Sequence, residues 1–139
     1  MTTRRLRSER GTALIETAFT LPIILLICVG IFEFGRAYQV QQVLTNAARE
    51  GARVAVLPDY TDAQVIAVVR QYMTDGGLTP IDPVLLRTVA VPPATGSRIT
   101  INYPFSFIVL NPVARLVTST SAVGQGVLMM QATALMRNE

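Results

Sequence analysis

The sequence contains no histidine, and its only cysteine is Cys28. The lack of histidine excludes zinc sites built from cysteine and histidine, and it excludes catalysis by a histidine base. A single cysteine excludes a disulfide within the chain, and we interpret Cys28 as a small hydrophobic residue of an apolar segment. Serines such as Ser106 and Ser119 have no histidine partner, and we interpret Asp59 and Asp62 as capping residues. We therefore expect no enzyme, cofactor or metal site.

Lysine is also absent, and the arginines are unevenly distributed. Within the first ten residues Arg4, Arg5, Arg7 and Arg10 stand against Glu9, so this stub carries the whole formal net charge of +3. Arginines and acidic residues balance over the rest of the chain. No basic face remains there, so we expect no nucleic-acid partner.

A long apolar run follows the arginine stub. As a helix, Thr12 to Phe32 would span roughly 31 Å, close to the thickness of a bilayer core. We expect a membrane-spanning helix over residues 12–34 and an outer domain over residues 35–139. The arginines place residues 1–11 in the cytoplasm. A secretory signal peptide is the alternative, but its apolar region would be shorter and would end at a small-residue cleavage site.

Two residues inside this run need an explanation. Glu16 is a carboxylate in an apolar segment, which is costly unless it reaches the lipid headgroups or finds a partner. Pro22 removes the backbone hydrogen bond to the carbonyl of Ala18, so it should kink or loosen the helix. Pro22 is either a tolerated membrane-helix proline or a flexible point that helps the chain to leave the bilayer.

The pattern beyond residue 35 predicts an α+β domain. The long helix is expected to continue from Arg36 to Leu57, where Pro58 ends it, with one buried face. A second helix starts at a capping box of Thr61 and Gln64 and ends at Gly76-Gly77. The residues expected on the buried face of the first helix are Val40, Val43, Leu44, Ala47, Ala48 and Ala55. The apolar stripe of the second helix consists of Val65, Val68, Val69, Tyr72 and Met73.

Three strands are expected to form a small antiparallel sheet that covers the long helix. They are Val84–Val91, Arg98–Phe105 and Val127–Met136, with a turn over residues 92–96 between the first two. The alternation in the second strand points Ile99, Ile101, Tyr103 and Phe105 toward the helix. The third strand alternates less clearly and would also suit a helix. A strand is preferred because two strands would cover the helix poorly.

The helical block Asn46–Arg53 carries candidates for a helix interface. Arg49 and Arg53 share one face, and Glu50 is placed to pair with Arg53. Gly51 costs about 1 kcal/mol relative to alanine inside a helix, which suggests close approach of another backbone, from the sheet or from a neighbouring subunit. The alternative is a solvated charged face with an incidental glycine.

These blocks resemble known families. Gly11, with Glu16 five residues further on, resembles the processing site of type IV prepilins, in which a membrane peptidase cuts after the glycine. Together with Leu21-Pro22, Phe32–Arg36 and Asn46–Arg53, this block resembles the TadE-like family, which are small pilin-like proteins of tight-adherence (Flp) pilus systems. The resemblance covers about residues 8–57, and it implies a pilin-like fold.

The resemblance implies a single-pass protein of the bacterial inner membrane whose leader, residues 1–11, is removed between Gly11 and Thr12. The amine freed on Thr12 would then pair with Glu16 of a neighbouring subunit. A carboxylate that reaches the cytoplasmic headgroups is the other explanation of Glu16. Many pilins carry phenylalanine where this chain has Thr12.

Two functions are consistent with these observations. The first is a minor pilin or pseudopilin that acts in pilus assembly. The second is a membrane-anchored accessory factor that stays outside the filament. The expected partners are membrane lipid, other pilin or pseudopilin subunits, a prepilin peptidase and the pilus assembly platform.

Overall fold

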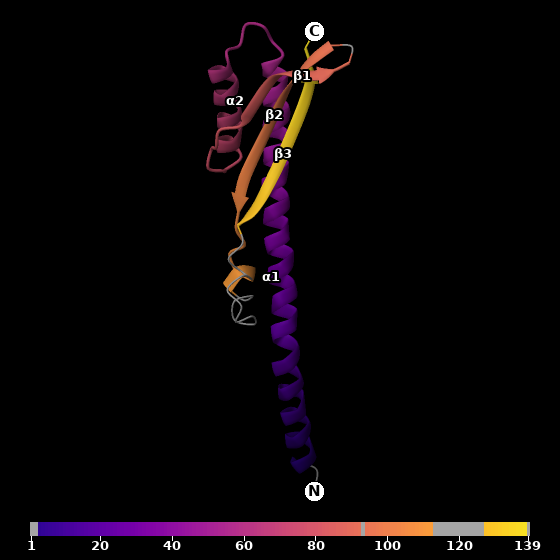
Figure 1. The fold of residues 1–139 in the computed structure, drawn as a ribbon. Coiled ribbons are helices and arrows are strands. Elements are labelled where there is room, and N and C mark those ends of the chain that lie inside the picture. The colour runs from indigo at the N-terminus through magenta and orange to yellow at the C-terminus, as the bar shows by residue number, and fades with distance from the viewer. Residues whose placement is uncertain (1–2, 93, 113–126, 139) are drawn as a thin grey trace.

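A single long helix carries a small α+β domain at one end (Figure 1). The structure is a computed structural model that describes residues 3–92, 94–112 and 127–138, with side chains from residue 11 onward. The elements are α1 (Thr3–Ala55), α2 (Asp62–Asp75), β1 (Val84–Val91), β2 (Ala94–Phe105) and β3 (Leu128–Arg137). This is the predicted class: a long N-terminal helix, a second short helix and a three-stranded antiparallel sheet.

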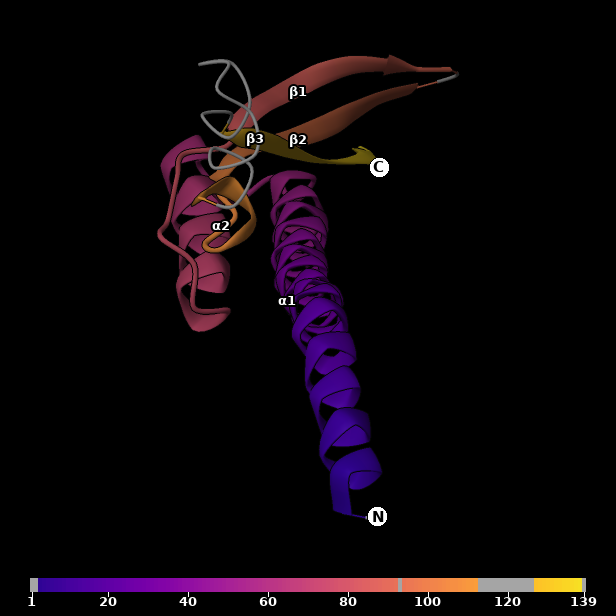
Figure 2. The same ribbon diagram turned by 90° about the horizontal axis from the view of Figure 1, so that it is seen from below.

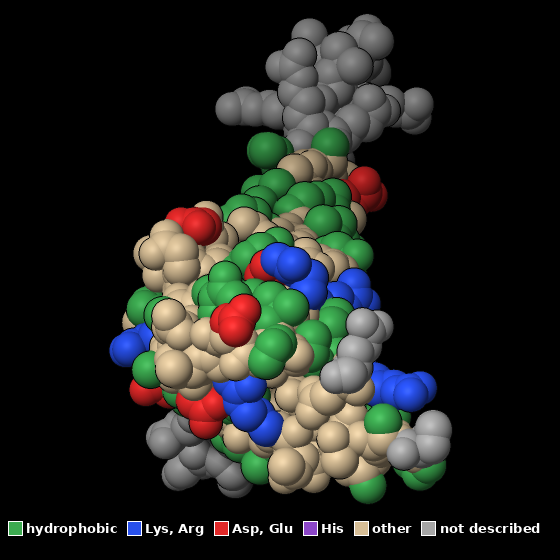
Figure 3. All heavy atoms as spheres, turned by 90° about the horizontal axis from the view of Figure 1, so that it is seen from above, with side chains coloured by type: hydrophobic (Ala, Val, Ile, Leu, Met, Phe, Trp, Pro, Cys, Tyr) green, Lys and Arg blue, Asp and Glu red, His purple; other side chains and the backbone are tan. Residues whose placement is uncertain are grey.

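The first half of α1 projects from the domain. It contains one stretch that is long and apolar enough to cross a membrane, with a mean hydropathy of 2.3 over its most apolar window, none of it buried within the chain. Hydrophobic side chains cover this projecting part of the helix (Figure 3). An apolar surface of this length needs an apolar environment, so α1 indicates a single-pass membrane anchor.

The second half of α1 packs at the centre of the domain and contributes many of its core residues. All the predicted positions of its inner face are buried except Val43, which is half-buried because it lies at the edge, against Gly76 at the end of α2. The helix ends at Ala55, two residues before the predicted end. Residues that precede a proline disfavour helical geometry, and the N–H of Leu57 instead forms a turn with the carbonyl of Val54.

Helix α2 begins and ends as its sequence predicted. Thr61 and Gln64 form the complete capping box, and Gly77, which follows the C-cap Gly76, has a φ of 75° that suits glycine. The buried residues of α2 are Val65, Val69 and Met73. The other two residues of the predicted stripe are more exposed: Val68 is half-buried and Tyr72 is 38% exposed.

The sheet has the order β1-β2-β3, and both pairs are antiparallel. The turn between β1 and β2 is shorter than predicted, since Val91 already pairs with Ala94. Gly96 permits this arrangement, because a Cβ there would lie 2.7 Å from the carbonyl oxygen of Met136 on β3. The third segment is a strand, shifted by one residue from its predicted bounds.

Both helices lie on the same face of the sheet (Figure 2). Ile99 and Ile101 of β2 point toward α1 and are fully buried, as the alternation predicted, and Phe105 is 2% exposed. Arg87 of β1 fixes the loop between the helices: it donates hydrogen bonds to the carbonyls of Ala55 and Tyr60 and pairs with Asp62. The sheet and the two helices therefore enclose one core at the end of the membrane helix.

Candidate functional site

The predicted processing site lies on the projecting part of α1. Gly11 and Thr12 are both exposed. A Cβ added to Gly11 would meet no atom within 4 Å. A second molecule can therefore approach this residue of the helix from the side.

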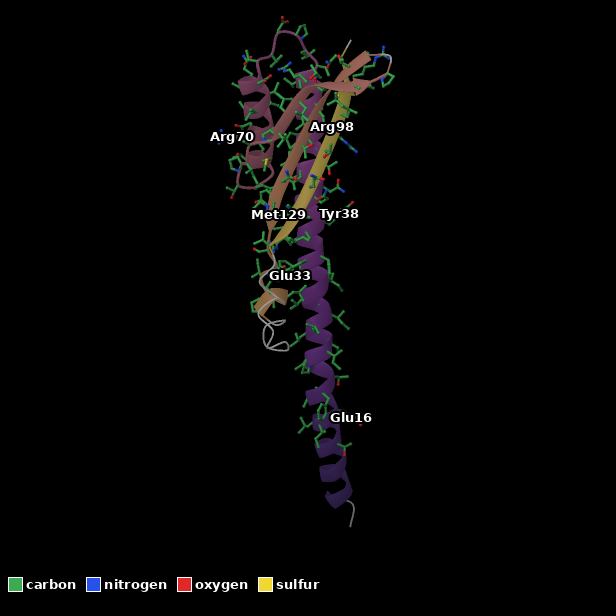
Figure 4. The ribbon with its side chains drawn as sticks, in the orientation of Figure 1. Glu16, Glu33, Tyr38, Arg70, Arg98 and Met129 are labelled. Carbon is green, nitrogen blue, oxygen red and sulfur yellow. The ribbon has the colours of Figure 1, made fainter. Side chains whose placement is uncertain are left out.

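Glu16 is exposed on the same part of α1, far from the outer domain (Figure 4). Its main-chain carbonyl accepts a hydrogen bond from the hydroxyl of Thr20. Among the residues whose side chains the structure describes, none forms a hydrogen bond or ion pair with the Glu16 carboxylate. The lipid headgroups or another molecule could provide a partner for this charge.

Pro22 lies inside α1, and the helix continues through it. The ribbon shows no sharp bend in this region, so the predicted kink is not observed (Figure 1). A proline removes only one hydrogen bond, so the adjoining turns keep the helix in register. One turn earlier, Thr17 donates its hydroxyl hydrogen to the carbonyl of Ala13 at 2.8 Å, which satisfies this polar group within the helix.

The block at the outer end of α1 has an outward and an inward face. On the outward face, Arg53 donates two hydrogen bonds to the Glu50 carboxylate, at 2.9 and 2.5 Å, so the predicted pair is present. These hydrogen bonds from Arg53 lower the pKa of Glu50 below its ordinary value, although partial desolvation opposes the shift. Arg49 and Arg53 are both exposed, and their role in an interface stays a prediction.

Gly51 faces inward, where it is buried between α2 and the sheet. A Cβ at this position would lie 2.4 Å from Cγ2 of Val69 and 3.5 Å from Cγ1 of Ile99. The expected close approach exists, but the prediction of another backbone as the neighbour was wrong. The neighbours are side chains of the same chain, because α2 packs directly over this turn of α1.

A cluster at the boundary between the projecting helix and the domain was missed by the sequence analysis. Glu33 is fully buried, and its carboxylate has two partners. Oε2 accepts a hydrogen bond from Nη2 of Arg36 at 3.1 Å, and Oε1 accepts the backbone N–H of Val109 at 2.6 Å. Figure 4 shows Glu33 on α1 at the level of the segment that follows β2.

Arg36 and three aromatic rings complete this cluster. The guanidinium of Arg36 lies 4.3 Å from the ring centroid of Phe105, and it donates a hydrogen bond to the carbonyl of Ser106. The ring of Phe107 meets those of Phe34 and Phe105 edge to face, at centroid distances of 5.9 and 5.2 Å. The segment after β2 is thus attached to the last turns of the apolar part of α1.

The sequence did contain one signal for this cluster. Glu33 lies between two phenylalanines with an arginine three residues later, which is the spacing of an intrahelical ion pair. The contact with Val109, which is 76 residues away, leaves no trace in the local pattern.

The described residues contain no group of three or more histidine, cysteine, aspartate or glutamate side chains that could hold a metal ion. Cys28 is exposed on the apolar part of α1. The absence of enzymatic activity remains an expectation.

Comparison with known proteins bears on α1 alone. Residues 11–53 match the family model of TadE-like proteins, which confirms the predicted resemblance over these residues. The matched segment includes Gly11, Glu16, Glu33 and the block that ends at Arg53. No curated protein and no solved structure matches the chain. The family indicates a pilus-associated protein of tight-adherence systems.

Proposed function

We propose that this chain is a pilin-like subunit, a minor pilin or pseudopilin, that acts in assembly of a tight-adherence type IV pilus. It is made as a precursor in the bacterial inner membrane, with its N-terminus in the cytoplasm and its α+β domain outside. A prepilin peptidase removes residues 1–11, and the mature chain begins at Thr12. Its partners are membrane lipid, other pilin or pseudopilin subunits, the peptidase and the assembly platform.

One observation carries this proposal. Glu16 is a carboxylate without a partner among the described side chains, on an exposed apolar helix, five residues after an accessible glycine. A charge at this depth needs a partner, and the described side chains of α1 provide none. The amine freed on Thr12 of a neighbouring subunit would supply one, and it would fix the register between two helices.

The contrast between the folded domain and the exposed apolar helix supports the same conclusion. The outer domain encloses its own core around the second half of α1, while every described residue from 11 to 28 is exposed. Lipid covers this apolar surface before assembly, and the helices of other subunits would cover it afterwards. A folded domain on an uncovered apolar helix suits a subunit that passes from bilayer to filament.

External filaments sheared from cells provide the test. The proposal predicts that an antibody against the outer domain detects the processed chain in the sheared fraction, while an inner-membrane marker is absent from it. A chain found only in the membrane fraction of cells that display pili would contradict the proposal. It would then be the accessory factor that stays outside the filament.

A further inference from the structure

The segment after β2 continues in the direction of that strand, alongside α1 and toward the apolar part of the helix (Figure 1). Two contacts fix the position of this segment along α1. The N–H of Val109 binds the carboxylate of Glu33, and the ring of Phe107 packs against that of Phe34. Glu33 and Phe34 are the last residues of the predicted span, so this segment lies at the outer boundary of the bilayer.

Several of the exposed side chains at this level are apolar. Ile108 is 62% exposed and Val109 is 38% exposed. On α1, at the same level, Ile31, Phe32 and Phe34 are between 64% and 70% exposed. Residues 104–112 contain no charged side chain. The segment after β2 and this part of α1, which are far apart in the sequence, thus present apolar side chains at the same level.

The two charged side chains at this level have partners within the protein, although Nε of Arg36 is buried without a hydrogen-bond partner among the described residues. Glu33 accepts the N–H of Val109, and Arg36 donates both to Glu33 and to the carbonyl of Ser106. A backbone N–H without a partner would make entry into the bilayer boundary costly, and the Glu33 carboxylate provides a partner for that of Val109. The ion pair removes the net charge from the same turn, and the guanidinium is directed away from the span, toward the domain.

We propose that Phe107, Ile108 and Val109 form a second membrane contact, in the acyl chains of the outer leaflet just below the headgroups. The domain is then attached to the bilayer at two points, by the span and by this segment. Two attachments fix the orientation of the domain on the membrane, whereas a single helix would leave it free to rotate. The occupant is lipid, because the exposed side chains are continuous with those of the spanning helix.

The test uses the full chain in unilamellar vesicles of phosphatidylcholine and phosphatidylglycerol. Cys28→Ala provides a cysteine-free background, into which Ile108→Cys is introduced and labelled with an environment-sensitive fluorophore. Leu86→Cys is the control in water, since Leu86 is 49% exposed on the outer face of the sheet, and Ile31→Cys is the control in lipid. Quenching is measured with lipids that carry a nitroxide high on the acyl chain, and separately with aqueous iodide.

The proposal predicts that nitroxide lipids quench the label at residue 108 several-fold more than the label at residue 86, and that iodide does the reverse. Iodide quenching at residue 108 equal to that at residue 86 would overturn the proposal, because the segment would then lie in water. Protection from both quenchers would also overturn it, in favour of a protein neighbour.

Two controls keep these outcomes distinct. If Ile108→Cys changes the circular dichroism of the chain, Val109→Cys takes its place. Lipid quenching at Ile31 tests the span itself, and none of these measurements depends on pilus assembly.

Discussion

The backbone N–H of Val109 donates a hydrogen bond of 2.6 Å to Oε1 of Glu33, across 76 residues of sequence. Glu33 is fully buried, although it lies in the last turn of the apolar part of α1. This contact joins the segment after β2 to the end of the apolar part of α1. It ties the orientation of the outer domain to that of the span.

Removal of this carboxylate should release the segment. In Glu33→Ala, the N–H of Val109 and the guanidinium of Arg36 lose their acceptor in a buried place. Amide hydrogen exchange of the full chain in nanodiscs should become about tenfold or more faster over residues 106–110. Glu50→Ala is the control: it breaks an exposed pair and should leave exchange of this segment unchanged. Equal protection in Glu33→Ala and wild type would show that the aromatic contacts suffice.

Gly51→Ala should destabilise the outer domain. The new methyl group gains up to about 1 kcal/mol in helix propensity but collides with Val69, and overpacking costs about 1–3 kcal/mol. Thermal unfolding in detergent micelles should therefore show a net loss. Because the clash is with one side chain, the same substitution should become neutral or stabilising in a Val69→Ala background.

Gly35→Ala is the matched control for this prediction. It is also a glycine of α1, but a Cβ at this position would meet no atom within 4 Å. The substitution should stabilise the chain by up to about 1 kcal/mol. If Gly51→Ala stabilised the domain as much as Gly35→Ala, the packing of α2 over this turn would be wrong.

Ile101→Ala should remove a large part of the stability of the domain. Ile101 is fully buried between β2 and α1, and loss of such a side chain costs about 2–5 kcal/mol. Leu86→Ala, on the exposed face of the sheet, should cost far less. Denaturant unfolding of both variants measures the difference, and equal losses would mean that the sheet presents its other face to the helix.

Much of the fold followed from periodicity and from caps. The burial of Leu44 and Ile99 came from the helical and strand patterns, and the start of α2 from the capping box at Thr61. These signals are local, so a single sequence shows them. The end of α1 was misplaced by two residues because the effect of Pro58 reaches back along the chain.

The candidate site was less predictable. The position of Gly51 was identified from its cost in a helix, but its neighbour Val69 depends on how α2 packs. Likewise, Glu33 was visible as a charge, whereas its partner Val109 arrives through tertiary structure. A sequence shows that a residue needs a partner, and only the fold shows which one it has.

Glu16→Ala should leave membrane insertion intact and impair pilus assembly. The substitution makes the helix more apolar, so the anchor should not suffer. The variant lacks the carboxylate that, in the proposal, pairs with the amine of Thr12 in a neighbouring subunit. Membrane fractionation and the yield of sheared pili measure the two effects separately. Normal pilus yield in the variant would show that Glu16 is only an interfacial carboxylate.

The mass of the mature chain tests the central claim most directly, namely that α1 is a prepilin-type helix processed after Gly11. Mass spectrometry of the protein extracted from membranes with an active prepilin peptidase should show a chain that begins at Thr12. A bulky substitution at Gly11, or loss of the peptidase, should leave the precursor. A chain that still begins at Met1 when the peptidase is active would contradict the account.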